Sequence, residues 1–316
     1  MNLRRLALAA GLAVAVTPAF AQNNPLGALN SILNAVQQQP GKAAPANPLG
    51  ALLAPAQQPA ATAAPAGIDF VALLSQDAPI DEGKEIEIGR QLAAVLLGSK
   101  PMHGDAALQR YVNQPGRWIA LQSSRPLLPW TFTVLDDPGF NAFAAPGGYV
   151  FVTSGLVDRV DEAELAGILA HEITHVTERH HLQALRQKAR AGAFTQLIGS
   201  QIRTGSAVGS LVSQQVLAMA RNLYSSGLDQ QDEFDADRQG VVFAARAGFD
   251  PYGLPGVLQQ LRGQAPDDPL FALSLSTHPP AQQRLDALAS AMGNRLDAFT
   301  ARPVVKIDQR VARAKR

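Results

Sequence analysis

The stretch from Asp161 to Val176 constrains the fold more than any other part of this 316-residue chain. Asp161 and Glu164 have the spacing of a capping box, which begins a helix. Apolar residues then recur every three or four positions, at Leu165, Ile168, Leu169, Ile173 and Val176. This periodicity predicts a helix with one face buried in the core of a domain.

The same predicted helix carries His171, Glu172 and His175 in the order H-E-x-x-H. The two histidines are one turn apart, so both rings can reach one zinc ion at about 2.0–2.1 Å. Glu172 is rotated from them by about 100 degrees, so it can miss the metal and still reach a water beside it, as a general base must. The alternative is that these are two ordinary histidines on a helix surface.

A third zinc ligand has two candidates, and the nearer one is His181. It stands ten positions after His171, as in the metzincin pattern H-E-x-x-H-x-x-G-x-x-H, where the glycine breaks the helix. Glu178, a helix former, occupies the position of that glycine. A continuous helix would place His181 about 15 Å along the axis from His171. We therefore expect His180 and His181 at or beyond the helix end, partly charged and favourable to the helix dipole.

The second candidate lies in a helix predicted over residues 228–251, where Glu233 and Asp237 are one turn apart. Glu233 would be the third ligand. Asp237 could accept a hydrogen bond from the outer nitrogen of a ligand histidine and thereby fix its tautomer. The alternative is a solvated acidic helix face, because other aspartates lie nearby.

The rest of the chain predicts the α+β class, a mainly helical domain with a small β-sheet beside the active-site helix. Helices are expected over 81–99 and about 104–122, and a strand over 130–137. Two more strands are expected within 141–156, joined by a turn at residues 146–148. The second of them would offer an open edge for an extended substrate, with Asn141 and Gly148 as candidate residues of that edge or of the outer shell. Alternatively, that strand is internal and fully paired.

The N-terminus is typical of a secretory signal peptide over residues 1–21, cut after Ala21, with a membrane anchor as the alternative. Residues 22–66 predict a disordered linker rich in Ala, Pro and Gln, in which NPLGAL occurs twice. The metalloprotease domain is expected over 67–300 and a basic tail over 301–316. Cysteine is absent, so imidazole and carboxylate groups must hold any metal. The net charge of +1 disfavours nucleic acid as a partner.

The two site motifs, HEITHVTERHH and EFDAD, resemble those of metallopeptidase family forty-eight. This family of zinc endopeptidases includes HtpX, BepA, the Oma-type gluzincins and the CAAX prenyl proteases. Three further segments are similar to the family: EIEIGRQLA, NAFAAPGGYVFVTSGL and STHPPAQQR. The resemblance covers residues 80–300 and implies a zincin-like fold. No tetratricopeptide repeats and no long apolar segments are visible, so the chain is most similar to small secreted members.

The resemblance also implies roles for individual residues. One Zn²⁺ per chain would be held by His171, His175 and Glu233. Glu172 would be catalytic. Asp237 would be a supporting acid, sometimes called the proton donor, with His278 and Arg284 near the site.

His278 precedes two prolines that stiffen its loop and prevent helix there. It could take the open zinc position as a plug or donate a hydrogen bond to the oxyanion. It could also be a surface histidine that caps its own loop.

Together these features predict a periplasmic zinc-dependent endopeptidase, soluble or peripheral to a membrane, that degrades misfolded or stalled envelope proteins. We expect no transmembrane span after signal cleavage, and the outer-membrane assembly machinery is a candidate partner. One alternative is a periplasmic chaperone or assembly factor with little or latent proteolysis. The other is a metzincin-like protease that uses His181.

Overall fold

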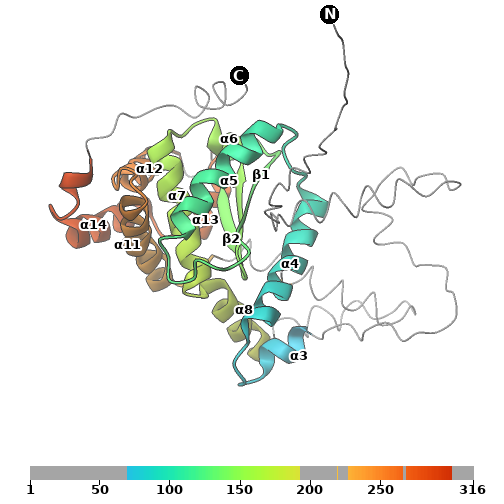
Figure 1. The fold of residues 1–316 in the computed structure, drawn as a ribbon. Coiled ribbons are helices and arrows are strands. Elements are labelled where there is room, and N and C mark those ends of the chain that lie inside the picture. Colours follow the sequence, from blue (N-terminus) through green and yellow to red (C-terminus); the bar gives the residue numbers. More distant parts are fainter. Residues whose placement is uncertain (1–69, 193–218, 220–226, 266–267, 301–316) are drawn as a thin grey trace, which may run out of the picture. The chain divides into compact units, whose positions relative to one another are not determined.

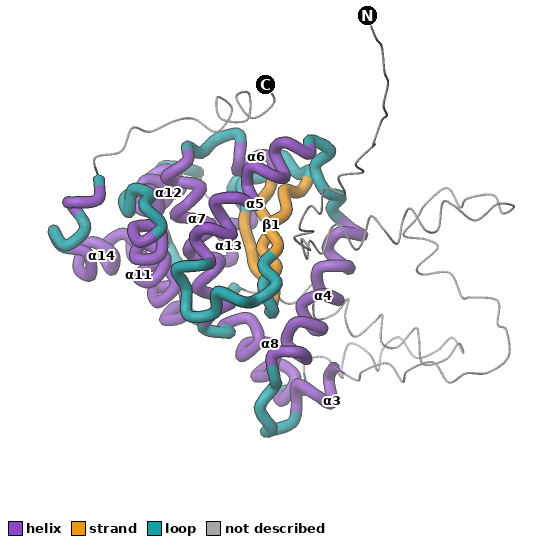
Figure 2. Tube along the Cα trace, viewed as in Figure 1, coloured by secondary structure: helices purple, strands orange, loops and turns teal. Residues whose placement is uncertain are grey.

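The computed structural model describes residues 70–192, 219, 227–265 and 268–300, which belong to one compact unit, Gln57–Arg316. These ranges are mostly helical and contain one small sheet, so the α+β prediction is confirmed (Figures 1 and 2). The predicted signal peptide, the linker with its repeats and the basic tail lie outside the described residues.

The longer helices are α4 (Glu82–Ser99), α5 (Ala106–Ala120), α7 (Glu162–Thr177), α8 (His180–Arg190), α11 (Gln230–Arg246), α12 (Gly253–Arg262) and α14 (Ala281–Met292). The shorter ones are α3 (Phe70–Ser75), α6 (Ser154–Val157), α13 (Ala272–Thr277) and the 3₁₀ turn Asp297–Phe299. The strands are β1 (Thr131–Leu135), β2 (Ala142–Ala145) and β3 (Tyr149–Thr153). The predicted helices over 81–99 and 104–122 are therefore confirmed as α4 and α5. The two strands expected within 141–156 are confirmed as β2 and β3, and β3 ends at Thr153 because this residue caps the short helix α6.

The sheet has the order β1-β3-β2, with β1 and β3 parallel and β2 and β3 antiparallel. The central strand is thus β3, which was expected to provide the open edge. That expectation is wrong, because β3 is paired on both sides. Gly148 is not at a substrate edge either. It lies in the β2–β3 turn at a φ of +103°, and its carbonyl accepts a hydrogen bond from Thr131 N at 2.8 Å.

Side chains of α5 close the outer edge of β1. The amide of Gln109 bonds both backbone groups of Val134, at 2.7 Å to the oxygen and 2.9 Å from the nitrogen. Asn113 bonds both backbone groups of Phe132 in the same way. Two side-chain amides therefore cover the β1 edge where a fourth strand could pair. The other edge of the sheet is formed by β2.

The pairing of β2 with β3 determines which backbone N–H and C=O groups of β2 point outward. Thr153 N donates to Asn141 O at 3.0 Å, so Asn141 is a hydrogen-bonded position of the antiparallel ladder. Such positions alternate along a strand. The backbone N–H and C=O of Ala142 and Ala144 therefore point away from β3.

Helix α7 is the buried centre of the domain and packs against α11, α12, α5 and β2 (Figure 1). Its predicted capping box is present: Asp161 accepts from Glu164 N at 2.9 Å, and Glu164 accepts from Asp161 N at 2.8 Å. The five stripe residues named from the sequence are all buried. Helix α11 approaches α7 closely at Gly240, where an added Cβ would lie 3.0 Å from His171 N. This close packing brings the acidic face of α11 to the histidines of α7.

Candidate metal centre

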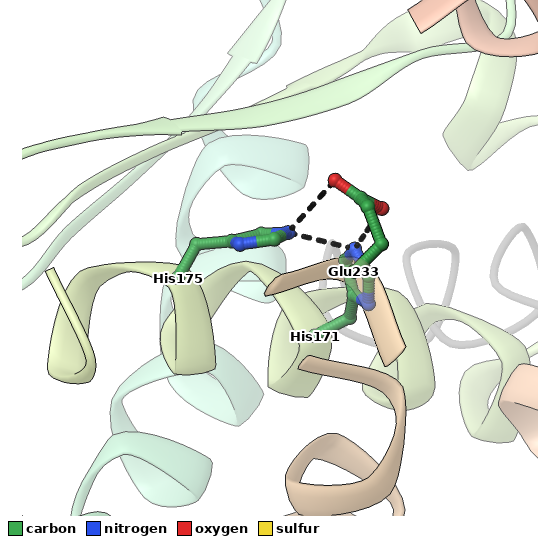
Figure 3. A group of neighbouring side chains, drawn as sticks. All are labelled: His171, His175 and Glu233. Atoms are coloured by element: carbon green, nitrogen blue, oxygen red, sulfur yellow. Dashed lines mark hydrogen bonds and ion pairs between the residues drawn. The ribbon is translucent and has the colours of Figure 1, made fainter. Parts of the chain in front are cut away.

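Three buried side chains from two helices meet at one point. His171 and His175 project from the same face of α7, and Glu233 reaches them from α11 (Figure 3). The two histidine Nε2 atoms are 3.0 Å apart, and each lies 3.6 Å from an oxygen of Glu233. Among the described residues, this is the group of acidic and imidazole side chains that could hold a metal ion.

These separations suit a tetrahedral zinc ion. Ligand atoms at about 2.0–2.1 Å from a tetrahedral centre are about 3.3–3.4 Å from one another, between the distances found here. The buried Oε2 of Glu233 has no hydrogen-bond partner among the described residues. A buried carboxylate oxygen without a partner is costly unless a cation or donor satisfies it. The three residues therefore fit zinc in both spacing and chemistry.

The outer nitrogen of each histidine is also held. His171 Nδ1 lies 2.9 Å from Asp237 Oδ1, and His175 Nδ1 lies 3.0 Å from His180 Nδ1. With both outer nitrogens protonated, each Nε2 keeps its lone pair for the metal. His180 then presents its own Nε2 toward Asp232, 3.7 Å away.

Asp237 lies behind His171 and is paired with Arg284. The guanidinium donates from Nε to Oδ2 at 2.8 Å and from a terminal nitrogen to Oδ1 at 2.5 Å. Burial alone would raise the pKa of Asp237, but the Arg284 charge and its hydrogen bonds hold that pKa well below the usual range. Asp237 is 1% exposed and stays ionised, with its oxygens bound to Arg284 and His171. This placement suits orientation of His171 and not donation of a proton to a substrate.

Glu172 lies beside the ligand group and is 3% exposed. Burial, with the nearby Glu233 carboxylate adding to it and Arg284 opposing it, raises the pKa of Glu172 to about 8. A cation on the neighbouring ligands would lower that pKa again. A carboxylate whose proton affinity is raised in this way is suited to take a proton from water and return it.

The chain turns sharply after α7. The helix ends at Thr177, although Glu178 is a helix former, and Arg179 adopts the left-handed conformation with a φ of 60°. Tertiary contacts hold this turn: Arg179 Nε lies 2.9 Å from the buried Glu85, which also binds Arg125 at 2.8 Å. The expectation that His180 and His181 lie at or beyond the end of this helix is therefore confirmed.

The turn folds His180 and His181 back toward the site. Both are buried, at 5% and 8% exposed, and the ring centroid of His181 is 5.2 Å from that of His175. Burial lowers the pKa of His180, and burial with three neighbouring imidazoles lowers that of His181 to about 3. They are therefore neutral, which corrects the expectation of partly charged histidines at a helix end. His181 lies near the metal group without belonging to it.

Two hollows meet at Glu172. The first, here called the β2 hollow, lies along β2 and is lined by Asn141, Ala142, Phe143, Glu172, His181 and His278, among others. The second, the aliphatic hollow, also includes Glu172 and His278. Its apolar wall consists of Leu156, Ile168, Leu254, Val257, Leu258 and Leu261. No pattern in the sequence indicated this wall, because its residues come from separate helices.

His278 borders both hollows, from an extended residue between α13 and α14. Its Nδ1 lies 3.1 Å from Ser274 O, a carbonyl that can only accept, and its Nε2 lies 3.7 Å from Glu233 Oε2. Burial and the Arg284 charge lower the pKa of His278 to about 4, so the ring is neutral. The loop expected before α14 is confirmed. His278 is partly buried in it, bonding its own loop through Nδ1 while its Nε2 faces Glu233.

Comparisons with known proteins agree with this geometry. A family model described as Peptidase family M48 matches residues 106–292. The beta-barrel assembly-enhancing protease of Escherichia coli (strain K12) is 33% identical over 211 residues, which cover 64% of this chain and 42% of that protein. The protease HtpX homolog of Salinibacter ruber is 30% identical over 187 residues, or 50% of this chain and 66% of that one.

The match to the Escherichia coli protein therefore extends over less than half of that relative's length. Among solved structures, the crystal structure of S. mikatae Ste24p matches with a TM-score of 0.34 and 16% identity. That match covers 63% of this chain and 55% of the other. None of the helices in the described ranges is both long and apolar enough to cross a membrane.

Proposed function

This chain belongs to peptidase family M48, whose members are zinc metallopeptidases, and from that premise we propose that it is a zinc-dependent endopeptidase of the cell envelope. Its substrates would be misfolded or stalled proteins. The observation that carries the proposal is the convergence of His171, His175 and Glu233 on one point, with the buried carboxylate of Glu172 beside it.

In this proposal His171, His175 and Glu233 hold one zinc ion per chain. The bound metal supplies the Lewis acidity that lowers the pKa of a water from about 15.7 toward 7. Glu172 takes the proton from that water and returns it to the leaving amine. Asp237 and Arg284 orient His171, so we assign Asp237 a positioning role in place of proton donation.

The outer edge of β2, which no strand of the described residues covers, supports binding of an extended substrate. Ala142, whose N–H and C=O point away from β3, lines the β2 hollow together with Glu172. A peptide paired there would be held by main-chain hydrogen bonds, which read little sequence. Asn141 begins this edge and borders both hollows. Such binding suits the varied sequences of unfolded proteins.

The aliphatic hollow supports the same class of substrate. Its wall of Leu, Ile and Val side chains adjoins Glu172, so it can receive an apolar side chain close to the cut bond. Folded proteins bury most such side chains, whereas unfolded proteins expose them. The hollow therefore favours unfolded chains over folded ones.

His278 supports latency more than oxyanion stabilisation. Because its Nδ1 proton is directed at the Ser274 carbonyl, its Nε2 carries a lone pair toward the metal site. A lone pair can bind zinc but cannot donate to an oxyanion. Such a plug would keep proteolysis low until a substrate or partner moves the loop. The same geometry favours the second candidate function, which is an assembly factor with latent proteolysis.

The location and partners belong to the proposal as well. A periplasmic site after signal cleavage at Ala21 agrees with the name of the relative, a beta-barrel assembly-enhancing protease. The outer-membrane assembly machinery is accordingly a candidate partner.

Substrate trapping tests the proposal. The zinc-loaded Glu172→Gln variant, expressed in the native envelope, should retain uncut unfolded proteins that the wild type degrades. Glu178→Gln, beyond the end of the same helix, is the matched control and should cut normally. If both the wild type and the His278→Ala variant capture such proteins and neither cuts them, the result would support the assembly factor.

A further inference from the structure

His181 combines a buried, unsatisfied ring nitrogen with a side chain that lines the β2 hollow. Its side chain is 8% exposed, and its buried Nδ1 has no hydrogen-bond partner among the described residues. The other four imidazoles of the site differ, because each of them has a ring nitrogen within 3.1 Å of a neighbouring polar atom. A buried polar atom left without a partner costs about 1–3 kcal/mol.

The position of His181 indicates what could satisfy that nitrogen. The side chain lines the β2 hollow, together with Glu172 and residues 141–143 of the sheet edge. An extended peptide in that hollow presents N–H and C=O groups on both of its edges. One edge can pair with β2, and the other then remains free for a side chain of the protein.

We propose that His181 is a peptide-binding residue, whose Nδ1 forms a hydrogen bond with the backbone of an extended peptide lying in the β2 hollow. This inference rests on the proposed function, because the peptide is the substrate of the same site. Either tautomer of a neutral imidazole serves, since a peptide backbone offers both a donor and an acceptor. The hydrogen bond reads backbone and not side chains, in keeping with varied substrates.

A role as zinc ligand competes with this inference and is less well supported. The ligand group is complete with His171, His175 and Glu233, which leave the fourth position to water or His278. His181 stands beside His175, with its ring steeply inclined at 60° to that ligand. Its contribution is therefore separable from metal binding, and zinc content reports on it independently.

Two substitutions separate hydrogen bonding from packing. His181→Leu fills a similar space without a polar atom. His181→Asn keeps an amide close to the position of Nδ1 and can bond a backbone group. His103→Leu is the matched control, because His103 lies outside both hollows.

The experiment measures binding without cleavage. Each substitution is placed in the zinc-loaded Glu172→Gln chain, and the Kd for a fluorescein-labelled, unfolded β-casein peptide is measured by anisotropy, with zinc content and melting temperature recorded for each variant. His181→Leu should weaken binding about tenfold at unchanged zinc content, which corresponds to about 1.4 kcal/mol, a typical value for one net hydrogen bond. His181→Asn should restore most of the affinity, and His103→Leu should match the parent.

Equal affinity in the Leu variant, loss of zinc in either His181 variant, or no binding by the parent would overturn the inference. If His181→Leu does not fold, the His181→Asn and His181→Ala variants are compared instead. Equal Kd values for these two variants would also overturn the inference. Because the readout is affinity, a chain that binds peptide but never cuts would refute the protease and leave the role of His181 standing.

Discussion

The buried pair between Arg284 and Asp237 should be strongly coupled, so that removing both side chains costs less than the sum of removing each one alone. The two side chains are 5% and 1% exposed, and two hydrogen bonds of 2.8 and 2.5 Å join them. Arg284→Met would leave the Asp237 carboxylate without its cation in a place that water does not reach. Asp237→Asn would leave the guanidinium equally alone.

The magnitude follows from the burial of the pair. Breaking a buried ion pair by removing one partner costs about 3–5 kcal/mol. For a domain of this size each kcal/mol lowers the melting temperature by roughly 2–4 °C, so each single variant should melt about 6–20 °C lower. In the double variant no charge is left unpaired, and the amide carbonyl that replaces the carboxylate at position 237 can still accept from His171. The double variant should therefore be less destabilised than the sum of the singles by about 2 kcal/mol or more.

The assay is urea unfolding of the zinc-free chain for the wild type, both single variants and the double variant. Measured without metal, the coupling term of the cycle reports on the pair without a contribution from zinc binding. A separate zinc competition with a chelator should show affinity about tenfold lower in Asp237→Asn, because the amide holds His171 less firmly. Additive destabilisation in the double-mutant cycle would show that the two side chains are not coupled and that burial of the pair has no such cost.

The sheet edge, the loop histidine and the buried imidazole of α8 each offer a further test. Ala142→Pro removes an outward N–H of the β2 edge without touching the β2–β3 ladder, so KM for unfolded casein should rise about tenfold at unchanged zinc content; an unchanged KM would exclude edge pairing. His278→Ala should raise basal casein hydrolysis if the residue is a plug, whereas a fall in kcat of about a hundredfold would assign it to the oxyanion. The pKa of His181 is about 3 in the folded chain and 6.5 in the unfolded one, so protons bind the unfolded state more strongly. As the pH falls from about 7.5 to 5.0, this histidine should therefore lower the free energy of unfolding of the zinc-free chain by about 2 kcal/mol. Urea unfolding of His181→Leu should not show this contribution.

Much of the site was predictable because its signals are local. The capping box and apolar stripe of α7 depend only on neighbours three or four residues apart, and they determine the face that carries His171 and His175. Glu233 and Asp237 share a helix for the same reason. What no local pattern could show was the distance between the two helices, which depends on the close packing at Gly240.

The errors have a common physical origin in contacts between distant residues. Glu178 favours helix, but the chain turns at Arg179 because its guanidinium binds Glu85, 94 positions earlier in the sequence. The strand order likewise depends on a parallel pairing of β1 with β3, which the sequence of neither strand specifies. Asp237 has its place behind His171 because Arg284, 47 positions away, binds it there.

Zinc content and casein hydrolysis, measured on the same preparations of three chains, would separate the roles of ligand and base. We expect about one zinc per chain in the wild type and in Glu172→Gln, with hydrolysis lost only in the latter, because a general base acts on water and not on the metal. Glu233→Ala should lose both zinc and activity, because it removes a ligand. Loss of zinc from Glu172→Gln, or full zinc affinity in Glu233→Ala, would contradict the assignment of base and ligand.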